Sequence, residues 1–584
     1  MTPALTKTPK SRGEPASFKS NLWAVTLGAA VLCCGFELWW FSRTCFNEID
    51  FDGMAYTGIA RHLREGDFHT AINAFRSPLL SWLIAAFRWG NADYVHIGKL
   101  VSMGSFMLSL ALTYALGRSL WRSRLAGSLA ALLFALARGF AAAAVEVVTP
   151  DFLFAALALI YFLQLLRALR QDRWQDWLLL GAIHGVAFLA KAFALPWLAV
   201  CTVAALALSG KPWRTTVTRL AAAALLPALI ASGWAGVLHA KYGVFTTGSQ
   251  FKANLLLWTV HAIRDHRDPT YAVLTNLAPR LDAYGVMDPM PPGSWTWTYH
   301  SDIKTLVPAI LRAEEHNVPL VLKEILIVAT PGGLLAYGFA LVAAFRRRFQ
   351  YPAEWRFVAV SAIASAALVG AYSMLVFDPR YLFPLVPLLL LVASSFLAGD
   401  SEFHLRWRRV CQALVIAGMA VSLTYRSSPF RTLTRDFQVS CYDAGNRLKA
   451  HGQLRIVSLG SGPFPEHGVG WEAGYKAAYF GGARLVATVD ALPDTAQDSR
   501  LMADMEEASP NAILVWGRPD DPRRAALLQS PTLLGRSTSV EKIVDPVLGE
   551  VGVVIFWSPD RPSSGRPRVA SWFPGGGNLV ITVN

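Results

Sequence analysis

Repeated apolar runs of about 20 residues, the length of a helix that spans a bilayer, constrain this chain more than any other feature. Such runs occur near residues 20–41, 95–117, 125–145 and 220–239, among others. Only 16% of the 584 residues are charged, whereas soluble globular proteins carry about 25%. The sequence therefore predicts an α-helical polytopic membrane protein.

Lysine and arginine occur in short clusters between the apolar runs rather than in one patch. Cytoplasmic loops of membrane proteins prefer these residues, and this preference produces such a pattern. The formal net charge is +14, but its distribution argues against a nucleic-acid partner. Residues 1–19, rich in Pro, Ser and Thr and basic through Lys7, Lys10 and Arg12, are expected to form a disordered cytoplasmic tail. The first span, near 20–41, then ends on the outer face.

The alternation of apolar runs and basic clusters predicts about eleven transmembrane helices between residues 20 and 428. Residues 176–208 are too long for one span and contain Lys191 near their midpoint, so we expect two short spans with Lys191 at an outer turn. Residues 241–320 are expected to form a large outer loop. The later spans are expected at 322–345, 355–376, 381–398 and 408–425.

Beyond Thr424 the composition becomes that of a soluble domain, which we place at 429–584. Four strand-like runs alternate with helix-like segments, which predicts a small α/β domain. The odd number of spans places this domain on the outer face, with Cys45 and Cys441 on the same side as either a disulfide or two thiols. The strand-like runs are 455–459, 484–489, 512–516 and 551–557, and the helix-like segments are 442–450, 470–480 and 500–508.

The first outer loop, residues 42–78, contains the acidic stretch Glu48-Ile-Asp50-Phe-Asp52. Carboxylates next to hydrocarbon are costly to hold and therefore indicate function by default. Residues 52–64 have helical apolar spacing and a basic opposite face, which is typical of a helix lying in the membrane interface. Asp52 is expected at its start, where exposed N–H groups favour a carboxylate. Tyr56 follows one turn later on the same face.

Further charged side chains are expected on the same outer face. Each has a simple structural explanation: Lys191 as a snorkelling side chain, Arg380 as an interfacial anchor, and Asp151 as a helix cap after Pro150. Acids and bases from separated segments at one depth nevertheless favour a site for a charged, lipid-bound substrate. The set comprises Asp50, Asp52, Arg76, Glu146, Asp151, Lys191 and Asp378-Pro-Arg380-Tyr381.

Five short motifs resemble those of lipid-dependent GT-C glycosyltransferases, which include the protein O-mannosyltransferases and the lipid A aminoarabinose transferase. Asp52-Gly-Met-Ala-Tyr56 with Ile59-Ala-Arg61 resembles the D-E-x-x-Y…I-A-R stretch of their first periplasmic loop. The other four follow in the family's order over residues 20–400. They are Phe75-Arg-Ser-Pro78-Leu79 (basic-x-Pro-Leu), Thr149-Pro-Asp151 (the second acidic motif), Gly185-Val-Ala-Phe-Leu-Ala-Lys191 (G-L-A-x-L-T-K) and Arg380-Tyr-Leu-Phe-Pro384-Leu-Val-Pro387 (R-Y-x-x-P-x-x-P).

One position departs from the family pattern. The Glu that usually follows the first Asp is Gly53 in this chain. If the reaction requires a second acid, Asp50 or Glu48 must supply it.

The resemblance implies a GT-C fold in the plasma (inner) membrane and a sugar transfer that inverts the anomeric centre. The donor would be a polyprenyl-phosphate-linked sugar, and the acceptor a hydroxyl of a protein, lipid or surface glycan on the outer face. Asp52 is the expected general base, with Asp50 as a second catalytic acid. Basic side chains are expected to stabilise the departing phosphate. The expected substrate-binding residues are Tyr56, Arg76, Asp151, Lys191, Arg380 and Tyr381.

Asp151 has three open roles, which are to orient the acceptor, to position Lys191, or to bind a divalent cation, the one cofactor left open. Two other functions also fit the sequence. One is a polysaccharide ligase or polymerase from another GT-C branch, whose acceptor is carried on lipid as well. The other is a transporter or flippase, although the inverted repeats that usually accompany broken spans are not evident.

Overall fold

The computed structural model describes residues 16–46, 49–90, 92–137, 139–251, 303–375, 378–398, 405–424, 431–452, 454–460, 470–489, 508–545 and 549–557, with a few single positions between them. The predicted tail before residue 16, Glu48, most of the predicted loop between 252 and 302, and the chain after 557 lie outside the described residues. The side chain of Cys45 also lies outside the described residues. The choice between a disulfide and two thiols for Cys45 and Cys441 is therefore not decided by the structure.

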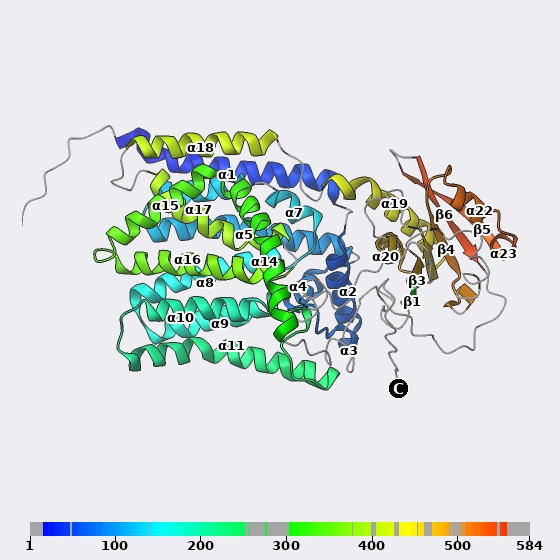
Figure 1. Ribbon diagram of the computed structural model, residues 1–584, viewed down its shortest axis with the longest axis horizontal. Coiled ribbons are helices and arrows are strands. Elements are labelled where there is room, and N and C mark those ends of the chain that lie inside the picture. Colours follow the sequence, from blue (N-terminus) through cyan, green and yellow to red (C-terminus); the bar gives the residue numbers. More distant parts are fainter. Residues whose placement is uncertain are drawn as a thin grey trace, which may run out of the picture.

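Long helices lie side by side in the larger part of the molecule (Figure 1). Five described helices are long and apolar enough to cross a membrane, or up to seven if each bent pair counts as one span. This is fewer than the roughly eleven predicted, because several expected spans are shorter helices: α9 (Trp174–Ala190), α10 (Ala194–Ala207) and α17 (Leu385–Leu397). The five long helices are α1 (Ala16–Cys45), α5 (Tyr94–Trp121), α8 (Asp151–Gln171), α11 (Trp213–Tyr242) and α16 (Pro352–Ser373).

Two helix pairs bend sharply. α6 (Arg124–Ala135) and α7 (Phe140–Glu146) meet at 55°, and α14 (Ile303–Ala329) and α15 (Pro331–Arg346) meet at 91°. The second bend corrects the single span expected at 322–345. Thr330 has φ +60° and caps α15 by accepting the Gly333 N–H, while Pro331 cannot continue the preceding helix. Residues 303–320, expected in the outer loop, form the first part of α14.

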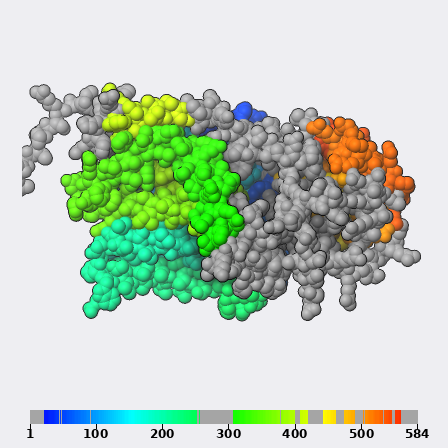
Figure 2. All heavy atoms as spheres, viewed as in Figure 1, coloured from blue at the N-terminus to red at the C-terminus, as the bar shows by residue number. Residues whose placement is uncertain are grey.

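Close helix contacts hold the bundle together. α5 packs against α6 and α8, and α8 packs against α9, which lies on α11. Gly127 of α6 permits one of these approaches, because a Cβ at this position would come within 2.7 Å of the Tyr114 carbonyl of α5. Figure 2 shows one side of the surface of the bundle. There, residues of α10 and α11 (cyan to green) lie beside those of α14–α16 (green).

The two ends of the bundle differ in character. At one end, ion pairs join helix ends: Asp172 lies 3.0 Å from Lys211 and 3.3 Å from Arg219, and Arg170 lies 2.7 Å from Glu354. Several of the basic clusters noted in the sequence gather here. At the other end lie α2 (Phe51–Glu65), α3 (Phe68–Ala71), α4 (Leu79–Phe87), the link between α7 and α8, the end of α9, and the short helix η2 (Pro379–Leu382) before α17.

A six-stranded sheet lies in the C-terminal part of the molecule, where the sequence predicts four strands. It follows α18 (Leu405–Thr424) and α19 (Arg431–Ala450) and has the strand order β1-β3-β2-β4-β6-β5. The central strands β3 (Arg484–Val489), β2 (Arg455–Leu459) and β4 (Ala512–Trp516) are parallel. α19 and α20 (Gly470–Gly481) share a buried apolar cluster with the sheet. The remaining elements are β6 (Gly549–Trp557), α22 (Pro522–Leu528) and α23 (Pro531–Leu534).

Two strands were not expected from the sequence. β5 (Ser537–Asp545) is an edge strand of the described sheet that pairs with β6, and polar residues interrupt the apolar pattern of its sequence. β1 (Thr275–Asn276) belongs to the expected outer loop and pairs antiparallel with β3. The outer loop and the C-terminal sheet are therefore joined by backbone hydrogen bonds.

Candidate active site

Asp50 and Asp52 lie at the N-terminus of α2. Asp50 caps the helix, because its carboxylate accepts the N–H of Gly53 (3.2 Å) and the N–H of Val148 (3.0 Å). The sequence predicts Asp52 at the start of this helix, and the cap itself is Asp50, two residues earlier. Asp52 lies in the first turn, where the helix dipole still favours its charge. Asp50 thereby connects α2 to the link between α7 and α8.

The position of Asp50 bears on the missing acid at Gly53. A Cβ on residue 53 would lie 2.6 Å from Oδ1 of Asp50 and 3.0 Å from the Cβ of Val148. The Asp50 carboxylate thus occupies the space into which a side chain at position 53 would project. Of the two acids that the sequence leaves open as replacements, the geometry favours Asp50, and Glu48 lies outside the described residues.

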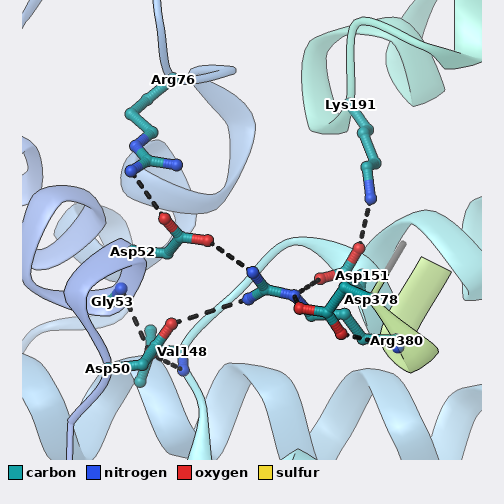
Figure 3. Close-up of polar contacts among 9 residues, drawn as sticks. All are labelled: Asp50, Asp52, Gly53, Arg76, Val148, Asp151, Lys191, Asp378 and Arg380. Carbon is teal, nitrogen blue, oxygen red and sulfur yellow. Dashed lines mark hydrogen bonds and ion pairs between the residues drawn. The ribbon is translucent and has the colours of Figure 1, made fainter. Parts of the chain in front are cut away.

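Arg380 is the centre of the charged cluster (Figure 3). It lies in η2, where Asp378 caps the turn by accepting the Arg380 N–H at 3.0 Å. Its guanidinium donates to Asp52 at 2.9 Å and lies 2.8 Å from the Asp378 carboxylate. It also faces Asp50 at 3.7 Å and Asp151 at 3.9 Å. One guanidinium therefore faces carboxylates from three separate parts of the chain.

Arg76 makes the second contact with Asp52, at 2.6 Å. A turn holds it in place, in which the Asn73 side chain accepts the backbone N–H groups of Phe75 and Arg76, both at 2.8 Å. The guanidinium also lies over the ring of Tyr56, 5.7 Å from the centroid. Tyr56 is buried and lies one turn after Asp52, as the sequence predicts, so its hydroxyl-bearing ring supports the arginine from beneath.

Lys191 forms an ion pair with Asp151 at the end of α9. Its ammonium also lies 4.6 Å from the ring centroid of Tyr381, which stacks on Tyr372 at 4.3 Å. The Ala192 N–H donates to the Ser77 hydroxyl, so the turn after α9 is tied to the loop that carries Arg76. Of the three roles open for Asp151, the contact supports the positioning of Lys191.

The two carboxylates of α2 have different electrostatic environments. Burial opposes ionisation of Asp52, but the charges and hydrogen bonds of Arg76 and Arg380 outweigh it and lower its pKa to about 2. Burial, followed by the nearby charge of Asp52, raises the pKa of Asp50. Burial likewise raises the pKa of Asp378, against the opposing charge of Arg380. Asp52 is thus the firmly ionised acid of the cluster.

Part of the cluster is exposed to solvent. The side chains of Asp52 and Asp50 are 24% and 23% exposed, whereas those of Arg76 and Asp151 are 5% and 4% exposed. The accessible carboxylates therefore rest on a buried layer of charged groups that fix their positions.

Glu146 and the possible divalent cation are the other two features expected at the site. Glu146 is the last residue of α7 and is buried, two residues before Val148. Within the described residues, no three His, Cys, Asp or Glu side chains are arranged to hold a metal ion. The acids of the cluster surround the Arg380 guanidinium instead.

The structure also adds residues to the site. Asp378 was expected on the outer face beside Arg380 but was assigned no role, and it is one of the nearest carboxylates to that guanidinium. Val148 contributes its backbone N–H, which no sequence pattern indicates. Tyr372 comes from α16 and completes the aromatic stack beside Lys191.

Comparison with known proteins identifies the fold. Residues 76–234 match the model of the dolichyl-phosphate-mannose-protein mannosyltransferase family. No curated protein sequence matches the chain. Among solved structures, ArnT from Cupriavidus metallidurans in the apo state is similar with a TM-score of 0.53 and 15% identity, over 92% of this chain and 98% of that one.

Two further structures agree with this comparison. ArnT from the same organism bound to undecaprenyl phosphate has a TM-score of 0.51 and 15% identity, with the same coverage of 92% and 98%. The oligosaccharyltransferase of Archaeoglobus fulgidus in the apo form has a TM-score of 0.52 and 10% identity, over 86% of this chain and 70% of that one. At these identities the similarity establishes the fold, which is the GT-C fold that the motifs predict.

Proposed function

We propose that this protein of the GT-C fold is an integral-membrane glycosyltransferase that moves a sugar from a polyprenyl-phosphate donor to an acceptor hydroxyl. The observation that carries the proposal is the convergence of Arg76, Lys191 and Arg380 with the Asp52 carboxylate at one end of the bundle. A phosphate-linked donor needs cationic groups for its leaving phosphate, and an acceptor hydroxyl needs a base.

The names of similar proteins support the class of donor. The matching family model is named for a dolichyl-phosphate sugar, and ArnT was solved with undecaprenyl phosphate. Both lipids are polyprenyl phosphates. The acceptor stays open among protein, lipid and surface glycan.

Asp52 is the proposed general base. It accepts the proton of the acceptor hydroxyl while the acceptor oxygen bonds to the anomeric carbon. The bond from that carbon to the phosphate oxygen breaks, and its electron pair leaves with the polyprenyl phosphate. Arg76 and Arg380 stabilise the negative charge that develops there. Attack from the side opposite the phosphate inverts the anomeric centre.

The resting contacts of Asp52 suggest how the base is activated. Both arginines hold Asp52 ionised but weakly basic, since its pKa is about 2. A bound donor phosphate would compete for the same guanidinium N–H groups. Their withdrawal from Asp52 would raise its basicity at the moment when donor and acceptor are both present.

The distribution of basic residues supports an outward-facing site. The ion pairs around Asp172 and Glu354 lie at the bundle end opposite the cluster, together with several of the basic clusters. Cytoplasmic loops favour Lys and Arg, so the candidate site lies on the outer face in this proposal. The N-terminus is then cytoplasmic and the C-terminal domain is extracytoplasmic.

Mass spectrometry of envelope glycans, lipids and proteins tests the function directly. Deletion of the gene should remove a pentose or hexose modification, and wild-type protein should restore it. Asp52→Asn should be made and inserted normally but should not restore it, because general-base catalysis contributes about 10²–10⁴-fold. An unchanged envelope after deletion would refute the function, and full restoration by Asp52→Asn would refute the base. A modification found only on a lipid-borne glycan would favour a ligase or polymerase.

A further inference from the structure

The C-terminal domain packs directly on the helix that carries the proposed base. α20 lies against α2 (Figure 1). Ile49 and Met54, which flank the two aspartates, are fully buried in one apolar cluster with Ala473 and Ala477 of α20. The beginning of α2 is therefore part of the core of the C-terminal domain as well as part of the site.

A chain of buried hydrogen bonds connects the two helices. The Tyr479 hydroxyl of α20 donates to the Thr57 hydroxyl at 2.7 Å, and Thr57 donates to the Gly53 carbonyl at 2.7 Å. On its other side, the Gly53 N–H is accepted by Asp50 at 3.2 Å. The peptide groups that adjoin residue 53, directly after Asp52, are thus held from both sides.

Lys476 lies one turn before Tyr479, so both side chains are on the same face of α20. Lys476 is only 2% exposed, and its positive charge lowers the pKa of Asp50 against the effect of burial. Asp50 also faces Asp52 on α2 and Arg380 on η2, and it accepts the N–H groups of Gly53 and Val148. Lys476 differs from these groups because it comes from the C-terminal domain.

We propose that Tyr479 and Lys476 of α20 are positioning residues of the active site, which hold the first turn of α2 and its two carboxylates in place for transfer. The inference rests on the proposed function and extends it, because the C-terminal domain then takes part in the reaction through α2. Neither residue needs to touch the donor or the acceptor.

Tyr479→Phe tests the hydrogen-bond chain, with Tyr442→Phe as the matched control. Tyr442 is 40% exposed on α19, and its ring contacts Phe480 rather than α2. The loss of one buried hydrogen bond should lower the rate of transfer roughly 2- to 10-fold. Hydrogen exchange of the amides at 51–57 should accelerate in the full-length variant while α5 stays unchanged. The control should change neither quantity.

Lys476→Met and Lys476→Arg test the charge, with the exposed Lys449→Met on α19 as control. Membranes from the producing strain supply donor and acceptor, and product is measured by mass spectrometry as a function of pH. Without the positive charge Asp50 holds its proton to higher pH, so the acid limb of the Lys476→Met profile should move to higher pH. Lys476→Arg should return it toward wild type. A merely structural role would lower the rate without moving the limb.

The outcomes separate this inference from the proposed function. If wild-type membranes transfer no sugar and the gene deletion changes no glycan, the function itself is wrong. If wild type transfers sugar but Tyr479→Phe leaves both rate and amide exchange unchanged, and Lys476→Met leaves the acid limb in place, the positioning role of α20 is wrong.

Discussion

Substitutions at Asp50 separate its role as a helix cap from its role as a second acid. Asp50→Ala removes the cap of α2, worth about 0.5–2 kcal/mol, and leaves the Val148 N–H without its acceptor, worth about 1–3 kcal/mol. We therefore expect a loss of about 2–4 kcal/mol of stability in this variant. Asp50→Asn retains an oxygen that can accept from Gly53 and Val148. Its stability should stay within about 1 kcal/mol of wild type.

The two variants should differ in stability but should both be impaired in sugar transfer. Asp50→Asn removes the charge that faces Arg380 at 3.7 Å. An ion pair of this length contributes up to about 1 kcal/mol, which corresponds to a rate lower by up to about 5-fold. Asp50→Ala should lose at least as much. The double substitution Asp50→Ala, Gly53→Glu should recover part of the activity, because the new carboxylate would project into the space that the old one leaves.

Two measurements check these expectations, one of stability and one of transfer. Thermal unfolding in detergent can be followed with a thiol-reactive fluorophore, since Cys34, Cys201 and Cys411 are buried in the folded protein. Transfer is measured in membranes of the gene-deleted strain that carry each variant. If Asp50→Asn transfers sugar at the wild-type rate, Asp50 acts as a helix cap and not as a second acid. Equal melting of the Ala and Asn variants would refute the capping argument. Gly53→Glu alone, which keeps Asp50 in the way, should be unstable and serves as the control for the double variant.

Three other perturbations follow from the same geometry. Arg380→Lys keeps the charge, but an ammonium cannot contact Asp52 and Asp378 together as the planar guanidinium does. The rate of transfer should therefore fall about 10-fold or more in Arg380→Lys, and further in Arg380→Gln. Equal rates for Arg380→Lys and wild type would contradict the bidentate role. The acid limb of transfer should belong to Asp50, whose pKa is raised, rather than to Asp52, whose pKa is about 2. Asp50→Asn should remove that limb. A limb that stays in place would assign it to another group, with Asp378 next to be tested. Reporter tags at Lys211 and Arg347 should be cytoplasmic and a tag at Ser563 should be extracytoplasmic; a cytoplasmic Ser563 would contradict an outward-facing site.

The sequence predicted two kinds of feature: helices and strands with a periodic apolar pattern, and charged residues that are costly to hold near hydrocarbon. α5, α8 and the strands β2 and β3 lie within a few residues of their expected places, because each shows its own apolar pattern. The acids and bases of the cluster were recognisable because such residues are rare at a membrane edge. Their convergence in the structure shows that composition and depth were sufficient to group them.

The rest depended on contacts between distant segments. Asp50 and Asp52 are equally suited to cap α2, and the choice between them involves the Val148 N–H, which is 98 residues away. The bend after Ala329 follows from the φ of +60° at Thr330 and its hydroxyl cap, where an apolar window suggests one continuous span. β5 is a strand because β6 lies beside it, although its own sequence is polar. The roles of Lys476 and Tyr479 follow only from the docking of α20 on α2.

The low pKa of Asp52 is consistent with its proposed role as the base if the two arginines that contact it also bind the phosphate of the donor. A carboxylate held by two arginines at 2.6 and 2.9 Å cannot readily accept a proton in the resting state. The same two guanidinium groups are the cations best suited to a bidentate contact with phosphate. Donor binding and activation of the base are then one event, since each N–H group given to the phosphate is withdrawn from Asp52. In this proposal Asp50 and α20 keep Asp52 in place during the exchange, through the cap of α2 and the hydrogen bonds from Tyr479.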